Sequence, residues 1–142
     1  MDFKNSSIFL GIVIAYCLQA NAATPNPKES EMKHYKELKT MDEYKAAIGS
    51  SKPQIIKFYT ESCGACKSMK TVFSNVARKE HNFADFSAIN IEDKAFQDLI
   101  KEHSLVAVPT TLFIKFGQVK KTDKGSMSEE DLDNQVKSFA KS

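Results

Sequence analysis

The sequence predicts an α/β fold in which a mixed central sheet carries helices on both faces. Two patterns predict it. Apolar, β-rich segments alternate with segments of helical periodicity, in the order β-α-β-α-β-α-β-β-α. The last two strands are joined by a short turn at Gly117, which makes them an antiparallel hairpin. Helical connections between the earlier strands indicate parallel pairing.

The first half of the domain contains two predicted strands and one helix. "HYKELKT" (34–40) is a short edge strand, although its propensities also allow a helix. Thr40 and Glu43 form a capping box that opens the helix "MDEYKAAI", and Gly49 ends it. "QIIKFYT" (54–60) is β-rich and short enough for a central strand.

The second half contains three strands and three helices. Helical spacing of apolar residues predicts a helix that runs to about Glu80 and packs one face into the core; these residues are Ala65, Met69, Val72, Phe73 and Val76. "FADFSAINIE" (83–92) alternates like a strand and leads into a helix capped at Asp93. "TTLFIKF" and "VKKTDK" form the hairpin. Ser128 and Asp131 open a terminal helix whose apolar face is Leu132, Val136 and Phe139.

The amino terminus differs in composition from the rest. An uninterrupted apolar run, Ile8 to Leu18, is followed by Ala20 and Ala22 at the −3 and −1 positions of a small-residue cleavage site. The run has the length of a signal-peptide core and is short for a membrane span, although an uncleaved anchor is the alternative. The predicted organisation is a signal peptide at 1–22, a flexible leader at 23–30 and one domain at 31–142.

Cleavage after Ala22 would remove Cys17 and leave only Cys63 and Cys66. Because of the predicted signal peptide, the protein is expected to be secreted, or to reside in a periplasm or secretory lumen. No membrane attachment is expected once the signal is removed. A single close cysteine pair is not a disulfide scaffold, so the core must hold the domain together.

The charge of the chain is nearly balanced, with 20 basic and 18 acidic residues. It offers no basic stripe for nucleic acid, and nucleic-acid binding is not expected. We expect a monomer.

The central motif is Cys63-Gly-Ala-Cys66, at the junction of a predicted strand and helix. A structural zinc site would need four ligands, and no second cysteine pair or cysteine–histidine pair is present. An inert disulfide is a second alternative. The third is redox exchange, because a helix amino terminus stabilises a thiolate at the first cysteine and places the second within disulfide distance.

Three blocks of the sequence resemble the thioredoxin family over Glu31 to Ser142: "KFYTESCGACKSM", "VPTTLFIKFGQV" and "KGSMSEEDLDNQVKSF". The resemblance implies the thioredoxin fold and thiol–disulfide chemistry, with Cys63 as nucleophile and Cys66 as resolving thiol. It implies a cis peptide bond at Pro109, for which a trans turn proline is the alternative. The implied substrate-binding residues are Ser62, Gly64, Ala65, Val108 and Gly125.

Four positions depart from the family pattern. Ser62 stands where a tryptophan commonly precedes the first cysteine, and Ala65 stands at the usual proline between the cysteines. Lys57 occupies the place of the family's buried acidic residue, and Ala88 that of its frequent lysine partner. Lys57 has two interpretations: its stem packs while its ammonium reaches water, or its amine is partly buried near Cys66 and modulates the thiol pKa values.

The predicted function is thiol–disulfide exchange on protein dithiols and disulfides through a mixed disulfide. The dithiol is itself the redox group, so no cofactor and no metal are required. Partners would be protein substrates and an unidentified redox recycling partner. The alternative is a secreted binding protein or effector that uses the same fold as a scaffold, with a structural disulfide.

Overall fold

The structure, a computed structural model, describes residues 33–142. The predicted signal peptide and leader lie outside the described residues. The elements are β1 (Lys36–Glu37), α1 (Met41–Ile48), β2 (Gln54–Tyr59), α2 (Gly64–Glu80), β3 (Asp85–Asn90), a 3₁₀ turn (Lys94–Phe96), α3 (Gln97–Glu102), β4 (Thr110–Lys115), β5 (Gln118–Lys124) and α4 (Glu129–Lys141).

The five strands form one mixed sheet in the order β1-β3-β2-β4-β5. β1, β3 and β2 are parallel, whereas β4 runs antiparallel to β2 and pairs with β5 in the terminal hairpin. The hairpin turns at Gly117, whose φ of 71° lies in the left-handed region. The predicted element order and mixed sheet are confirmed.

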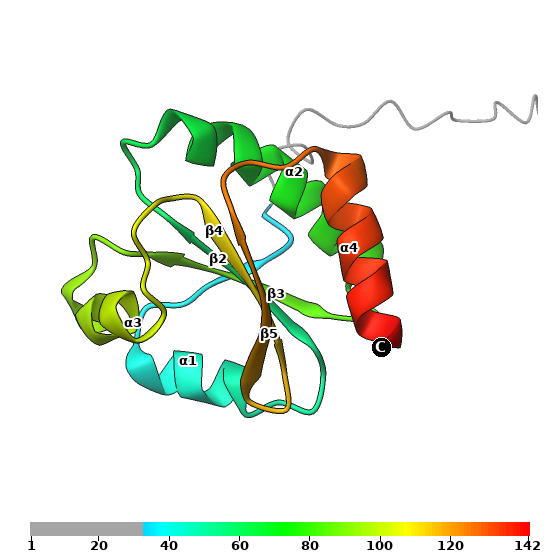
Figure 1. The fold of residues 1–142 in the computed structure, drawn as a ribbon, viewed down its shortest axis with the longest axis horizontal. Helices are drawn as coiled ribbons and strands as arrows, with labels where there is room; N and C mark the ends of the chain where they lie inside the picture. Colours follow the sequence, from blue (N-terminus) through cyan, green and yellow to red (C-terminus); the bar gives the residue numbers. More distant parts are fainter. Residues whose placement is uncertain (1–32) are drawn as a thin grey trace, which may run out of the picture.

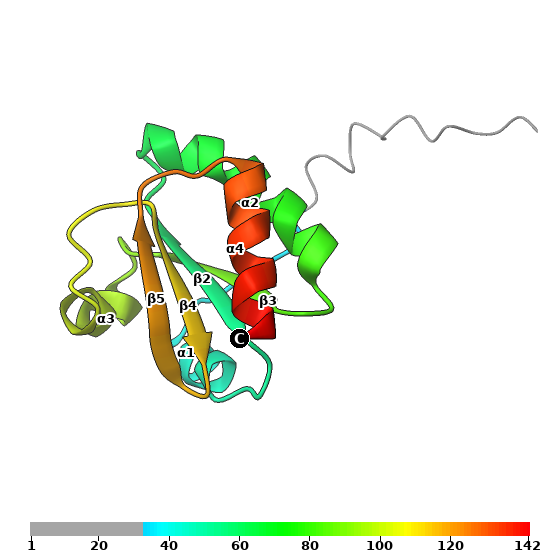
Figure 2. The same ribbon diagram turned by 45° about the vertical axis from the view of Figure 1, so that its right-hand side comes forward.

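Helices cover both faces of the sheet. α2 and α4 lie on one side, and α1 and α3 on the other (Figure 1; turned in Figure 2). Successive residues of β2 alternate between the two layers, so Ile55 packs with the α2 and α4 core and Ile56 with the α1 and α3 core. Lys57, two residues after Ile55, therefore faces the α2 side of the sheet.

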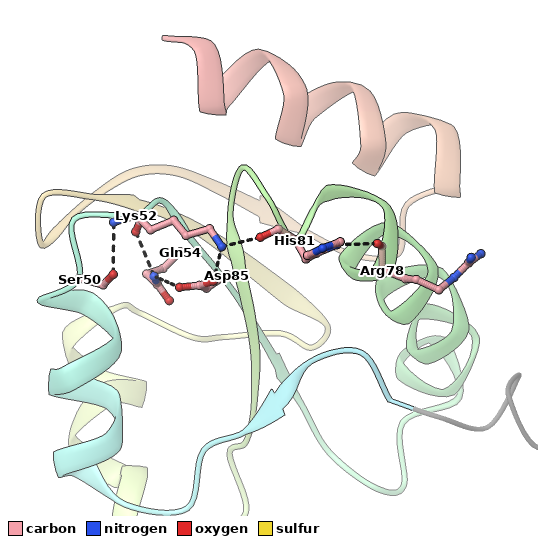
Figure 3. Close-up of polar contacts among 6 residues, drawn as sticks. All are labelled: Ser50, Lys52, Gln54, Arg78, His81 and Asp85. Atoms are coloured by element: carbon pink, nitrogen blue, oxygen red, sulfur yellow. Dashed lines mark hydrogen bonds and ion pairs between the residues drawn. The ribbon is translucent and has the colours of Figure 1, made fainter.

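Hydrogen bonds connect the turn after α2 to the residues at the start of β2, as Figure 3 shows. The Lys52 ammonium donates to Asp85 Oδ1 at 2.7 Å and to the His81 carbonyl. Gln54 adds a bond to Asp85 Oδ2 at 3.2 Å. A cation at the carboxyl end of a helix is favourable, because the last carbonyls carry partial negative charge.

Two strands are shorter than the sequence predicts. β1 has only two residues, and β3 begins at Asp85 because Phe83 and Ala84 both donate their N–H groups to the Glu80 carbonyl in the turn that ends α2. The helix expected after Asp93 begins as a 3₁₀ turn, with Asp93 Oδ1 accepting from the Ala95 N–H. None of the helices in residues 33–142 combines the length and the hydropathy of a membrane-spanning segment.

Candidate active site

The sheet brings two distant loops to one edge. β2 ends at Tyr59 and β4 begins at Thr110, and the two strands are antiparallel with Phe58 opposite Thr110. The chain leaving β2 and the chain entering β4 therefore meet at the same edge. The first carries the cysteine pair and the second carries Pro109.

Cys63 and Cys66 form a disulfide with their Cα atoms 5.2 Å apart. Cys63 is the N-cap of α2: its Sγ accepts from the Cys66 N–H at 3.1 Å, and its carbonyl accepts from the Lys67 N–H. Unpaired N–H groups and the helix dipole favour negative charge at this sulfur, so reduction would leave a stabilised Cys63 thiolate. Cys63 is half-buried, whereas Cys66 is only 4% exposed.

The Val108–Pro109 peptide bond is cis. The Val108 carbonyl oxygen lies 3.7 Å from Cys63 Sγ. The Pro109 carbonyl accepts from the Gly125 N–H at 2.8 Å, and Gly125 has a φ of 94°, which suits glycine. The structure thus joins Cys63, Val108, Pro109 and Gly125 in one site, although they are more than sixty positions apart at the extremes.

Small side chains are exposed next to Cys63 in the sequence, and one exposed apolar residue precedes Val108. Ser62, Gly64 and Ala65 are exposed beside Cys63. Val106, two residues before Val108, is 81% exposed, and the sequence reasoning did not single it out. The sequence does not distinguish it, because an apolar residue in "SLVAVPT" is equally consistent with a buried core position.

Lys57 is buried, with only 2% of its surface exposed. Its ammonium lies 4.8 Å from the centre of the Phe73 ring and 4.9 Å from that of Tyr35, within cation–π range, and 5.6 Å from that of Tyr59. Burial lowers the pKa of Lys57 to about 8; the positive charges of Lys33 and Lys70 act in the same direction, and Glu37 opposes them. The Lys57 ammonium therefore does not reach water, and its effect on the thiol pKa values stays a prediction.

Lys57 and Cys66 line the same cavity, of about 310 Å³. The remaining lining residues are Lys33, Tyr35, Glu37, Tyr59, Thr60, Glu61, Lys67 and Lys70. None of these residues is singled out by the sequence; Lys33, Tyr35 and Glu37 are far from the cysteines along the chain, and only Glu37 of the three lies in a strand, β1. Alternation along β2 does place Tyr59 on the face of Lys57.

Glu37 is the acidic residue near Lys57, and its carboxylate already has other hydrogen-bond and ion-pair partners. Glu37 Oε2 accepts from the Tyr59 hydroxyl at 2.9 Å, and Oε1 pairs with the Lys33 ammonium at 3.0 Å. Burial and the negative charge of Glu37 raise the pKa of Tyr35 to about 12, and that of Tyr59 further, so both phenols are neutral. On the neighbouring strand Ala88 stands opposite Lys57 and offers no polar group. In residues 33–142, no group of three or more histidine, cysteine and acidic residues is placed to hold a metal ion.

The sequence model of the thioredoxin family matches residues 35–138. The chain belongs to the thioredoxin family. A thioredoxin of Borreliella burgdorferi is 31% identical over 88 residues, which cover 62% of this chain and 74% of that protein. Mitochondrial thioredoxin of Bos taurus is 30% identical over 86 residues, 61% of this chain and 51% of its own length.

Solved thioredoxins share the fold. The Malassezia sympodialis thioredoxin Mala s 13 superimposes with a TM-score of 0.68 at 22% identity, over 75% of this chain and 90% of that one. Oxidised mitochondrial thioredoxin 3 of Saccharomyces cerevisiae superimposes with a TM-score of 0.64 at 23% identity, over 73% of this chain and 94% of that one. With its cysteine pair at disulfide distance on this fold, the chain is a thiol–disulfide oxidoreductase of the thioredoxin family.

Proposed function

We propose that this member of the thioredoxin family acts on disulfides and dithiols of secreted proteins, with Cys63 as the attacking and Cys66 as the resolving thiol. One observation carries the assignment of roles. Cys63 is half-buried at the helix N-cap, whereas Cys66 is 4% exposed, so a macromolecular substrate reaches Cys63 first. The helix terminus also stabilises the Cys63 thiolate.

The reductive direction has two steps. The Cys63 thiolate attacks a substrate disulfide, forming a mixed disulfide and releasing one substrate sulfur as thiolate. The Cys66 thiol then loses its proton and attacks Cys63 Sγ, which closes the Cys63–Cys66 disulfide and releases the second substrate sulfur. Two electrons pass from the dithiol to the substrate, and a redox partner protein restores the dithiol. The same steps in reverse oxidise a substrate dithiol.

Substrates are proposed to bind across the loop before β4. The Val108 carbonyl beside Cys63 offers a backbone acceptor to an extended substrate segment. Ser62, Gly64 and Ala65 would form one side of this surface and Gly125 the other. Because a serine replaces the bulky aromatic residue common in the family, we expect a narrower set of substrates.

Lys57 is proposed to receive the Cys66 proton during resolution. Both residues line one cavity, and a lysine whose pKa is lowered to about 8 is partly a neutral amine near neutral pH, which accepts a proton. Thiol titration of Lys57→Met tests this role. A Cys66 pKa and an exchange rate equal to those of the wild type would exclude it.

The location is proposed to be extracellular, periplasmic or within a secretory lumen, on the basis of the apolar run and the small residues at Ala20 and Ala22. Amino-terminal sequencing of the exported protein checks it, with Ala23 as the expected first residue.

An insulin-reduction assay tests the proposed activity. With dithiothreitol as reductant, the wild type is expected to accelerate insulin precipitation, and Cys63→Ser to return it to about the uncatalysed rate, because no attacking thiolate remains. Equal acceleration by the two proteins would refute the assignment of Cys63.

A further inference from the structure

The cavity beside Cys66 holds a buried cation without a dedicated counter-ion. The Lys57 ammonium faces the rings of Phe73 and Tyr35, which attract a cation but do not replace the oxygen acceptors that its N–H groups had in water. Among residues 33–142, the ion pair of Lys33 and the hydrogen bond of the Tyr59 hydroxyl in this region are made with Glu37, and Lys57 takes part in neither. A buried charge of this kind is costly unless an acceptor completes it.

Glu37 does not fill that role. Each of its carboxylate oxygens already has a partner, the Tyr59 hydroxyl on one and the Lys33 ammonium on the other. Among residues 33–142, neither Glu37 nor the Thr111 hydroxyl, which stands opposite Lys57 on β4, accepts a hydrogen bond from the Lys57 ammonium. An acceptor from solution would complete it.

The lining of the cavity carries a net positive charge. It contains four lysines and two glutamates. Lys33, Lys67 and Lys70 are exposed at its surface, while Lys57 is buried within it. Positive charges lining a concave, partly dry site concentrate anions from solution.

We infer that this cavity binds a small oxyanion from solution, such as phosphate, sulfate or a short carboxylate. The Lys57 ammonium would be the buried ligand, with Lys33 and Lys70 at the rim. A volume of about 310 Å³ is ample for such an ion. This site is additional to disulfide exchange and stands even if the proposed substrates are wrong.

The position of the site links it to the dithiol. Cys66 lines the same cavity, so a bound anion would oppose formation of the Cys66 thiolate by like-charge repulsion. By linkage, the oxyanion would bind more tightly to the oxidised protein than to a form with a Cys66 thiolate. A saturating oxyanion is therefore expected to slow the resolving step.

The experiment is a titration of the intact oxidised protein with inorganic sulfate, whose charge does not change near neutral pH. Ionic strength is held constant with sodium chloride, and the backbone amide signals of Thr60, Cys66 and Lys67 are followed by NMR. Saturable shifts are expected for the wild type. Lys57→Met is expected to lose saturation or to weaken binding about tenfold or more, because the buried ligand is gone.

Two exposed lysines supply matched variants that should not disturb folding. Lys70→Gln, at the rim, is expected to weaken sulfate binding several-fold, whereas Lys120→Gln, which removes the same charge from β5, should leave it unchanged. Shifts that never saturate, or equal affinities for Lys70→Gln and Lys120→Gln, would overturn the proposal whether or not Lys57→Met folds.

Discussion

Lys57→Met is expected to raise the free energy of unfolding at pH 7 by about 1–3 kcal/mol. The pKa of Lys57 falls from 10.5 to about 8 on folding, so keeping the buried amine protonated costs stability. Methionine has a similar length and no charge, and it fits among Phe73, Tyr35 and the neighbouring apolar residues without that cost. The lost cation–π contacts offset part of the gain.

The same change should alter how stability depends on pH. Because the folded pKa of Lys57 lies below the unfolded value, the unfolded chain binds more protons between about pH 8 and 10.5. The loss of unfolding free energy caused by the buried, protonated Lys57 is therefore fully present below pH 8. It declines as the pH rises through this window. The difference in stability between Lys57→Met and wild type should shrink accordingly.

Urea unfolding of the oxidised proteins from pH 6 to 9.5 measures this difference. Lys70→Met is the control, because it removes an exposed lysine from the rim of the same cavity. It should change stability by less than about 0.5 kcal/mol. A Lys57→Met protein that is less stable than wild type at pH 7, with a difference independent of pH, would show that the ammonium is not desolvated.

Cys66→Ser is expected to accumulate as a mixed disulfide with protein substrates. Cys63 still attacks, but the thiol that would release the substrate is absent, so the covalent adduct persists. Non-reducing electrophoresis after incubation with a disulfide-containing protein should show about tenfold or more adduct relative to wild type. The band should disappear with dithiothreitol.

Cys63→Ser is the matched variant, since it also keeps a single thiol in the motif. It should form little adduct, because Cys66 is 4% exposed and is not at the helix N-cap. A stronger adduct through Cys66 than through Cys63 would reverse the assigned roles.

Much of the fold could be predicted from local patterns. The capping box at Thr40 and Glu43 and the Ser128 cap are both present as expected, because capping depends on residues three positions apart. The alternation over 83–92 predicts too long a strand, since backbone hydrogen bonds to the Glu80 carbonyl hold Phe83 and Ala84 in the turn after α2. Such bonds leave no trace in side-chain alternation.

The site likewise has features that the sequence predicts and features that it does not. The dithiol and the cis-proline could be identified from their motifs, and the structure places them together. The environment of Lys57 could not be deduced, because it depends on Tyr35 and Glu37, which meet β2 only through the parallel pairing of β1 with β3. A lysine within a strand indicates neither burial nor exposure until its neighbours across the sheet are known.

The central claim is that the Cys63–Cys66 disulfide is redox-active, and its reduction potential tests that claim most directly. Equilibration with glutathione buffers, followed by thiol trapping, should give a value above about −300 mV with rapid exchange. A value below about −300 mV, with no exchange at a useful rate, would contradict the account and identify a structural disulfide in a binding scaffold.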